Sequence, residues 1–334
     1  MMRLSEAARA LDASSGGAGI VFDSVSTDTR TLRPGALFIA LRGERYDGHR
    51  FLAAAAASGA AAALVDAAGV REAPEALPLL VVEDTRLALG RLAAHWRKRF
   101  PLPLVGLTGS SGKTTVKEML ASVLRESIVA ARASDAPEQA VLATRGNLNN
   151  DIGMPLMLLE LAEHHRYAVM EMGMNHAGEI GYLTRLAGPD VAVVTNAGRA
   201  HIEYLGSEEA IARAKGEIFQ GLGPDGTAVI NADDRFAPLW RSLATGRRCI
   251  EFGLEQPAAV TGSYQLRDVD SEIVLKTPAG EASTRLSAPG VHNVRNALAA
   301  AAAAVALDIP VAVIAAGLER FSGIKGRLQR KPGL

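Results

Sequence analysis

The chain has 334 residues, of which 48% are hydrophobic, and it carries 36 basic and 36 acidic residues. This balance excludes a global electric field that would attract nucleic acid or an anionic membrane, so any anion site must be local. The single cysteine, Cys249, excludes an internal disulfide, and the N-terminus lacks the basic end and apolar core of a signal peptide. We therefore predict a cytoplasmic protein of two or three domains without a membrane span.

Residues 1–83 are predicted to form a small α/β domain. Short strands and turns come first, an alanine-rich helix starts at about Gly48, and Ala63–Asp66 is strand-like. Asp84 is a typical N-cap for a helix that continues to Phe100, after which prolines end it. We place the domain boundary at the start of this helix. The side chains that can pack from it are Leu87, Leu89, Leu92 and Trp96.

Residues 84–326 are predicted to form a central α/β domain of the phosphate-loop type. Apolar strand-like runs recur at 167–170, 191–195 and 228–230, separated by helical segments. This alternation predicts a mostly parallel sheet with helices on both faces, whose functional residues lie at the carboxyl ends of the strands. Residues 260–277 alternate like an antiparallel appendage, and the last helix is predicted at 296–307.

The segment LVGLTGSSGKTT at Leu104–Thr115 is typical of a phosphate-binding loop between a strand and a helix. Backbone N–H groups between Gly109 and Gly112 are expected to face phosphate oxygens at the helix N-terminus. Leu107 stands where the usual pattern has its first glycine, so Gly109 has to supply the flexibility. The alternative is an ordinary glycine turn. The predicted nucleotide-binding residues are Gly109, Ser110, Ser111, Gly112, Lys113, Thr114 and Thr115, with Lys113 supplying a positive charge and Thr114 a hydroxyl for Mg²⁺.

Glu171 ends the strand-like run YAVM, where nucleotide-binding sheets commonly place an acid that holds Mg²⁺. It is our first metal candidate, and the alternative is a surface carboxylate. Asn175 and His176 follow, and they either reach the substrate or cap the helix that starts near Glu179. The segment GNLNNDIGMP at 146–155 concentrates amide and acid side chains between glycines, which favours polar ligand recognition.

His201 and Lys215 follow another strand, VAVVTN. A neutral imidazole can bind a metal, although a single histidine in a loop usually does not. Lys215 carries a positive charge as it stands and cannot bind Mg²⁺, so a solvated helix face is the alternative.

Two further segments can contact a nucleotide. In AVINADD, the side chains of Asn231, Asp233 and Asp234 either bind ribose hydroxyls or form an Asx turn. In GVHNVRNALAA, Asn293 and Asn296 can read an adenine edge and His292 can stack on it. Helix capping by Asn293 is the alternative there.

Taken together, TGSSGKTT, GNLNNDIG, EMGMNHAGEI, AHIEYLGS with AKGEIF, NADD and HNVRNALAA resemble the Mur ligases of peptidoglycan synthesis, and best the members that add D-alanyl-D-alanine. The resemblance implies that the first domain binds a UDP-sugar substrate and the central domain binds ATP. The implied UDP-substrate residues are Ser26, Thr27, Asp28, Thr29, Arg30, Tyr46, Asp47, Gly48 and His49.

The resemblance also implies a set of metal and nucleotide contacts. Thr114 and Glu171 would share one Mg²⁺, and His201 would share a second with Lys215, provided that Lys215 is carbamylated. Asn293 and Asn296 would contact the nucleotide, and Arg327 a phosphate. Asn147 would support phosphate or metal, and it joins Asn149 and Asn150 as a candidate substrate residue.

The implied reaction joins D-alanyl-D-alanine to UDP-N-acetylmuramoyl-tripeptide, with ATP and Mg²⁺, through an acyl phosphate. We expect a monomer whose partners are these two substrates. Family members carry a third, C-terminal domain, and this chain stops about where that domain would begin, with residues 327–334 as the start of a linker. We therefore expect a fragment with weak or absent ligation. The alternatives are a sibling ligase that adds a single amino acid, a nucleotide-dependent binding module and a small-molecule kinase.

Overall fold

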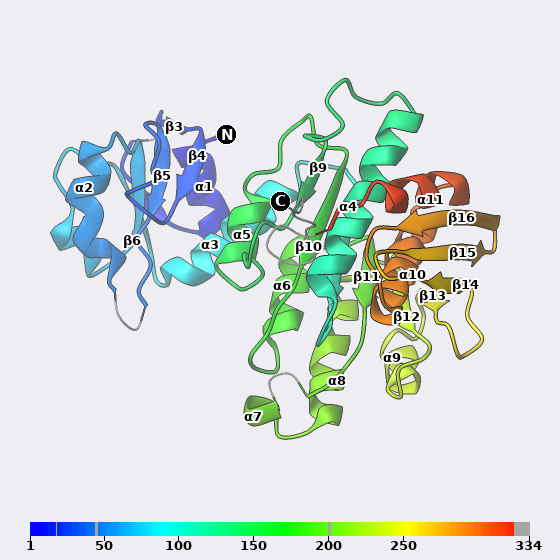
Figure 1. Ribbon diagram of the computed structural model, residues 1–334. Helices are drawn as coiled ribbons and strands as arrows, with labels where there is room; N and C mark the ends of the chain where they lie inside the picture. The colour runs from blue at the N-terminus through cyan, green and yellow to red at the C-terminus, as the bar shows by residue number, and fades with distance from the viewer. Residues whose placement is uncertain (18, 44–45, 200–201, 324–334) are drawn as a thin grey trace. The chain divides into compact units, whose positions relative to one another are not determined.

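The structure is a computed structural model that describes residues 1–17, 19–43, 46–199 and 202–323 (Figure 1). The chain forms two compact units. The first contains Met1–Pro101 together with Asp151–Ala162, and the second contains Leu102–Asn150 and the chain from Glu163 onward. The predicted boundary at residue 84 assigns helix α3 (Thr85–Arg97) to the central domain, whereas contacts group this helix with the first unit.

The first unit is built on a five-stranded sheet in the order β2-β7-β6-β5-β4. Strands β4 to β7 pair in parallel, and β2 pairs antiparallel to β7. Buried apolar side chains from the sheet and from α2 form one core beneath it, as expected of a small α/β unit. The strands are β2 (Ser14–Ser15), β4 (Ser24–Ser26), β5 (Ala36–Ile39), β6 (Ala62–Asp66) and β7 (Leu79–Val82).

The remaining elements of this unit are helices and one short strand pair. Strands β1 (Met2–Arg3) and β3 (Val21–Phe22) pair antiparallel outside the main sheet. Helix α1, which was not predicted, buries Leu4, Ala7, Ala8 and Leu11. The helices are α1 (Leu4–Leu11), α2 (Leu52–Ala57), α3 and α5 (Gly153–Leu158), with 3-10 turns η1 (Gly48–Phe51) and η2 (Gly69–Glu72).

Helix α3 begins as predicted, because the Asp84 carboxylate accepts hydrogen bonds from the N–H groups of Arg86 and Leu87. It ends at Arg97, three residues before the predicted end. Of the four predicted packing residues, three are buried, but Leu87 is 48% exposed and that prediction was wrong. The indole N–H of Trp96 donates to the carbonyl of Leu161 (3.0 Å), which ties α3 to the segment after α5 within the same unit.

The second unit contains a six-stranded, fully parallel sheet in the order β13-β12-β11-β8-β10-β9. The predicted parallel sheet is confirmed, and buried valine, leucine and isoleucine side chains fill its strands on both faces. The strands are β8 (Leu104–Thr108), β9 (Val141–Ala143), β10 (Tyr167–Glu171), β11 (Val191–Val194), β12 (Thr227–Asn231) and β13 (Arg248–Phe252).

The direction in which the chain adds strands reverses beside β8. It runs from β8 to β9 and β10 on one side, then to β11, β12 and β13 on the other. Right-handed crossovers therefore place α4 on one face and α6, α8 and α9 on the opposite face. Crevices at such a reversal are the usual ligand sites of parallel sheets. The crossover elements are α4 (Lys113–Ala130), α6 (Glu179–Ala187), α7 (Ile202–Leu205), α8 (Glu208–Gly216), η3 (Glu217–Gly221) and α9 (Ala237–Leu243).

An antiparallel appendage and two helices complete the described part of the second unit (Figure 1). The appendage has strands β14 (Thr261–Leu266) and β15 (Ser271–Thr277) where predicted, and a third strand, β16 (Gly280–Leu286), that was not predicted. Helix α10 (Val291–Ala306) starts five residues before its predicted start, directly after Gly290. Its buried alanines allow close packing against α4, and α11 (Val311–Glu319) also packs on α4. No described helix is both long and apolar enough to cross a membrane.

Candidate nucleotide and metal site

The predicted phosphate loop connects β8 to α4, in the expected order of strand, loop and helix. Its two glycines are required for different reasons. A Cβ atom on Gly109 would lie 1.8 Å from the hydroxyl oxygen of Thr195, so the backbone approaches β11 too closely for any side chain. Gly112 has a φ of 79°, a left-handed conformation that disfavours other residues. The loop is therefore held tightly against the end of β11.

Two backbone N–H groups that were expected to face phosphate are already hydrogen bonded. Ser110 donates to the backbone carbonyl of Asn196 (3.0 Å), and Ser111 donates to its side-chain oxygen (2.9 Å). The N–H groups of the first turn of α4 lack intrahelical acceptors, so they stay available to a phosphate in this conformation. Sequence reasoning missed Asn196, although it directly follows the recognised strand run VAVVT.

Lys113, the first residue of α4, lies back over the loop. Its ammonium group donates to the carbonyl of Gly109 (2.7 Å). Burial lowers the pKa of Lys113, and the negative charge of Glu171 partly opposes that shift. The lysine thus places a positive charge beside the loop and within electrostatic reach of the acid at the end of β10.

The structure brings together Thr114 and Glu171, the two residues that the resemblance implies as ligands of one Mg²⁺. The Thr114 hydroxyl donates to one carboxylate oxygen of Glu171 (3.0 Å), and the Asn149 amide donates to the other (2.8 Å). Glu171 is only 2% exposed, so the alternative of a surface carboxylate is wrong. The Thr114 hydroxyl and the Glu171 carboxylate are both hard oxygen donors. Adjacent ligands of an octahedral Mg²⁺ with bonds of about 2.05 Å lie about 2.9 Å apart, close to the 3.0 Å between these two oxygens. The pair therefore fits a magnesium ion.

Lys215 is buried in the last turn of α8, with 2% of its surface exposed, so the solvated-face alternative is wrong. Burial, together with the positive charge of Lys113, lowers the pKa of Lys215 to about 7. Within the described ranges, no carboxylate pairs with its ammonium group. His201, the predicted partner of Lys215, lies outside the described residues, as does Arg327.

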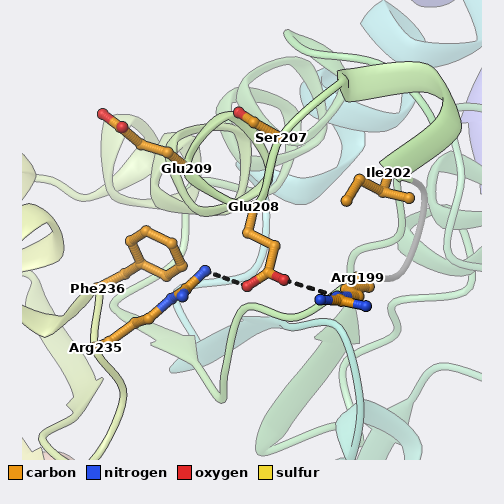
Figure 2. Close-up of a pocket in the computed structure, with 7 residues that line it drawn as sticks. All are labelled: Arg199, Ile202, Ser207, Glu208, Glu209, Arg235 and Phe236. Atoms are coloured by element: carbon orange, nitrogen blue, oxygen red, sulfur yellow. Dashed lines mark hydrogen bonds and ion pairs between the residues drawn. The ribbon is translucent and has the colours of Figure 1, made fainter.

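A cavity of about 730 Å³ lies at the first turn of α8. Figure 2 shows the Glu208 carboxylate between Arg199, which follows β11, and Arg235, which follows β12. The Arg235 guanidinium also lies over the Phe236 ring, 4.6 Å from its centre. Exposed ion pairs contribute little to stability. This cluster nevertheless connects two loops at the carboxyl edge of the sheet to the helix that carries Lys215.

A second cavity, of about 640 Å³, adjoins the phosphate loop. The buried Asn293 donates its amide to the carbonyl of Pro289 (2.8 Å), so its side chain secures the start of α10. Asn296 reaches the loop, since its side-chain oxygen would lie 2.3 Å from a Cβ on Gly112. The cavity is lined by Ser111, Gly112 and Thr115 of the loop region, by Asn196, Asp233 and Phe252, and by His292, Asn293, Arg295 and Asn296 of α10.

The polar residues after β12 shape the wall of this second cavity. The side-chain oxygen of Asn231 accepts from the N–H of Asp233 (3.0 Å), which is the Asx-turn alternative. The Asp233 carboxylate accepts hydrogen bonds from the N–H groups of Leu254, Glu255 and Gln256. Asp234 accepts from the N–H of Ala197 (2.9 Å). These side-chain oxygens therefore stabilise the loops that surround the cavity by accepting hydrogen bonds from their backbone N–H groups.

The remaining central candidates make other contacts. Asn147 and Asn150 are both exposed, and the backbone carbonyl of Asn147 accepts a hydrogen bond from the N–H of Asn149 (2.8 Å). The backbone N–H groups of Asn175 and His176 donate to the Glu179 carboxylate (2.6 and 3.2 Å), which closes the loop before helix α6. Asn149 is thus the member of the GNLNND segment whose side chain joins the Glu171 carboxylate.

In the first unit, Ser26–Arg30 forms a turn closed by its own polar groups. The Ser26 hydroxyl accepts from the N–H of Asp28 (3.1 Å), and the Arg30 guanidinium donates to both carboxylate oxygens of Asp28. This contact lowers the pKa of Asp28 to about 2. Thr27 and Thr29 lie within the same turn, and the Arg30 side chain is 86% exposed. The turn therefore presents a preformed cationic group to solvent.

Asp47 and His49 are engaged in the interior of the first unit. His49 is 1% exposed, and its Nδ1 lies 2.6 Å from Asp47, while its Nε2 accepts from the N–H of Asp66 (3.2 Å). The proton of a neutral His49 is therefore on Nδ1. A Cβ on Gly48 would lie 2.7 Å from the N–H nitrogen of Leu41, so this position needs glycine. Tyr46, by contrast, is 75% exposed and free to meet a ligand.

A Glu171→Gln substitution tests the predicted metal pair. The amide keeps the shape and can still accept from Thr114, but it loses the charge that attracts Mg²⁺. We expect the gain in ATP affinity on adding Mg²⁺ to fall by about tenfold, roughly 1.4 kcal/mol. Calorimetric titration of ATP with and without Mg²⁺ measures this gain. An unchanged gain would contradict the assignment, and Glu160→Gln, at an acid outside this pair, is the control.

Comparisons with known families and structures agree with this arrangement. Residues 107–304 match the Mur ligase middle domain, and residues 21–97 match the domain described as Mur ligase family, catalytic domain. The UDP-N-acetylmuramoyl-tripeptide--D-alanyl-D-alanine ligase of Escherichia coli K12 is 44% identical over 317 residues, which cover 93% of this chain. The enzyme of that name from Haemophilus influenzae is 41% identical and covers 94%. The chain spans 66% of the length of each of these relatives.

Solved structures show the same likeness. A crystal structure of MurF from Acinetobacter baumannii has a TM-score of 0.87 and 39% identity, over 99% of this chain and 71% of that one. The MurF ligase of Thermotoga maritima in complex with ADP has a TM-score of 0.78 and 27% identity, over 91% and 67% of the two chains. Since the middle-domain match alone covers more than half of its 334 residues, the chain belongs to the Mur ligase family.

Proposed function

We propose that this chain carries the ATP site and the UDP-substrate site of a ligase that joins D-alanyl-D-alanine to UDP-N-acetylmuramoyl-tripeptide. The observation that carries the proposal is the meeting of Thr114 and Glu171 beside a phosphate loop, in a chain similar to ligases of that name. The ADP complex of a similar structure supports ATP as the nucleotide. We propose the cytoplasm as its location.

In the proposed reaction, the tripeptide carboxylate attacks the γ-phosphorus of ATP, so an acyl phosphate forms and ADP leaves. The amine of the dipeptide then attacks the acyl carbon and displaces phosphate. Lys113 and the first-turn N–H groups of α4 would hold the transferring phosphoryl group and offset its charge. Bound Mg²⁺ would neutralise charge on the β- and γ-phosphate oxygens, and Thr114 and Glu171 would hold it.

We further propose that Lys215 is carbamylated. The buried position of Lys215 and its pKa of about 7 support a substantial neutral fraction of the amine near neutral pH. Only a neutral amine has the lone pair that attacks the carbon of carbon dioxide. The new N–C bond forms, one amine proton is released to solvent, and the product is an anionic carbamate on the lysine side chain. That change would turn a group that repels Mg²⁺ into an oxygen donor. It would also replace a repulsive charge beside Lys113 with an attractive one.

The first unit is proposed to bind the UDP part of the substrate through the turn at Ser26–Arg30 and the exposed Tyr46. The support lies in the exposed Arg30 guanidinium, which Asp28 orients in a planar pair, and in the free phenol ring. A guanidinium suits a diphosphate, because its donors match phosphate oxygens in pairs. Asp47 and His49 would act there through the shape of their loop.

Calorimetric titration with UDP-N-acetylmuramoyl-tripeptide tests the proposal directly, with the corresponding dipeptide precursor as control. We expect the chain to bind the tripeptide form with clear preference. Arg30→Ala should weaken binding by about tenfold, the value of one charge-assisted contact. Arg132→Ala, at an arginine in the other unit, should have no effect. Preference for the dipeptide precursor would instead indicate a sibling ligase, and binding of neither would remove the substrate assignment.

A further inference from the structure

A second buried lysine lies one helical turn beyond Lys113, and neither the sequence motif nor the proposed chemistry uses it. Lys117 is on α4 and is 2% exposed. Its ammonium donates to the backbone carbonyl of Thr144 (2.5 Å) and pairs with the Glu118 carboxylate (2.7 Å). Burying a charged group is costly, and an apolar side chain of similar length would fill this space without that cost. The ammonium contact therefore needs an explanation beyond packing.

The contact leads directly to the metal candidate. Thr144 directly follows β9 and is 1% exposed. Its hydroxyl oxygen accepts a hydrogen bond from the backbone N–H of Glu171 (2.9 Å). The hydroxyl itself lies within reach of the carbonyl of Val169 (3.5 Å), so it can donate on one side and accept on the other. Thr144 therefore connects the two residues: its backbone carbonyl accepts from Lys117, and its hydroxyl oxygen accepts from the backbone N–H of Glu171.

These contacts connect α4, which carries Thr114, to the end of β10, which carries Glu171. Helix α4 supplies Thr114 at its first turn and Lys117 one turn later. The last ladder pair between β9 and β10 joins Ala143 to Val169, two residues before Glu171. Beyond that pair, on the β9 side of β10, the backbone N–H of Glu171 donates to the Thr144 hydroxyl instead of to a backbone carbonyl. The same helix thus sets the position of both groups that would share Mg²⁺.

From these contacts we infer that Lys117, acting through Thr144, is a positioning residue that holds Glu171 where it and Thr114 share a divalent cation. The inference rests on the proposed function of that pair. Lys117 touches neither nucleotide nor metal in this role. It stabilises the end of β9, and Thr144 passes this constraint to the amide of Glu171. Metal sites are sensitive to such outer contacts, because ligands must be held close to their productive geometry.

The test compares ATP binding with and without Mg²⁺ in Thr144→Val, Thr144→Ser and Lys117→Met proteins. Valine keeps the shape of threonine but removes the acceptor for Glu171, whereas serine keeps the hydroxyl. We expect the Mg²⁺-dependent gain in ATP affinity to fall about tenfold in Thr144→Val and Lys117→Met, and to be retained in Thr144→Ser. Affinity for ATP without metal should stay within twofold. Glu118→Gln, which removes the charge of the partly exposed partner of Lys117, should leave the gain unchanged.

The outcomes separate this inference from the proposed function. A gain that is unchanged in both Thr144→Val and Lys117→Met overturns the inference, provided that Glu171→Gln removes the gain. If Glu171→Gln also leaves the gain intact, the metal pair itself is wrong and both proposals fail. Equal losses of affinity with and without metal would indicate a merely structural role for Lys117 and would also overturn the inference. If Lys117→Met does not fold, the Thr144 pair decides the question alone.

Discussion

A Lys215→Met protein is expected to be more stable than the unchanged protein at pH 7 in buffer free of carbon dioxide. The reason is that the ammonium form of Lys215 is disfavoured by burial and by Lys113, which lower its pKa from 10.5 to about 7. Each unit between these pKa values is worth about 1.4 kcal/mol, so burial of this lysine costs roughly 4 kcal/mol at pH 7. Methionine has similar length and carries no charge.

The advantage of the Lys215→Met protein should depend on pH in a defined direction. Between pH 7 and 10.5 the unfolded chain binds a proton at this lysine that the folded protein does not bind. Stability of the unchanged protein therefore rises with pH in this window, by up to about 1.4 kcal/mol per pH unit from this group. Below pH 7 both states are protonated and the full cost is constant. The difference between the two proteins should thus shrink as pH rises from 7 toward 10.5.

Denaturant unfolding of both proteins between pH 6 and 9.5 measures this difference. Lys276→Met replaces an exposed lysine, and its effect on stability should not change with pH in the same way. Added bicarbonate should stabilise the unchanged protein if folded Lys215 is carbamylated, because a modification specific to the folded state shifts the equilibrium toward it. It should have no such effect on Lys215→Met. A pH-independent difference between the two proteins would refute a lowered pKa at Lys215.

Gly109→Ala is expected to weaken ATP binding by on the order of 100-fold, about 2.7 kcal/mol. The new Cβ would lie 1.8 Å from the Thr195 hydroxyl oxygen and 3.3 Å from the backbone nitrogen of Asn196. Thr195 is short and 3% exposed, and its hydroxyl donates to the carbonyl of Ser111 (2.9 Å), so it has little freedom to move. The loop must shift instead, and it carries Lys113 and the N-terminus of α4 with it.

Calorimetry with ATP measures this loss, and Gly223→Ala is the matched control. A Cβ at Gly223 meets no described atom within 4 Å, so its affinity should match that of the unchanged protein. Adding Thr195→Ala to Gly109→Ala removes the closest atom, and a double-mutant cycle should then show recovery of part of the affinity. Full ATP affinity in Gly109→Ala would mean that the close approach of the loop to β11 is not needed for binding.

Local sequence patterns predicted a helix, strand or loop correctly where the contacts that stabilise it join residues close together in the chain. The run of apolar residues, glycines and Lys-Thr-Thr predicted β8, the loop and α4, and Asp84 predicted the start of α3. Strand runs at regular intervals predicted the parallel sheet, because buried parallel strands are continuously apolar. Helix α10 was placed too late, although the contact at its start, from the Asn293 amide to the Pro289 carbonyl, is also local.

By itself, then, the sequence determined the order of elements, the phosphate loop and the candidacy of Glu171, since these depend on local composition and spacing. Only the tertiary structure decided which partner each polar side chain takes. Asn196 accepts hydrogen bonds from the backbone N–H groups of Ser110 and Ser111, and the Thr144 hydroxyl accepts one from the backbone N–H of Glu171. It also decided that Lys215 is buried rather than solvated. Such pairings join residues at or just beyond the ends of different strands, so their burial and hydrogen bonding arise only when the sheet brings those strand ends together.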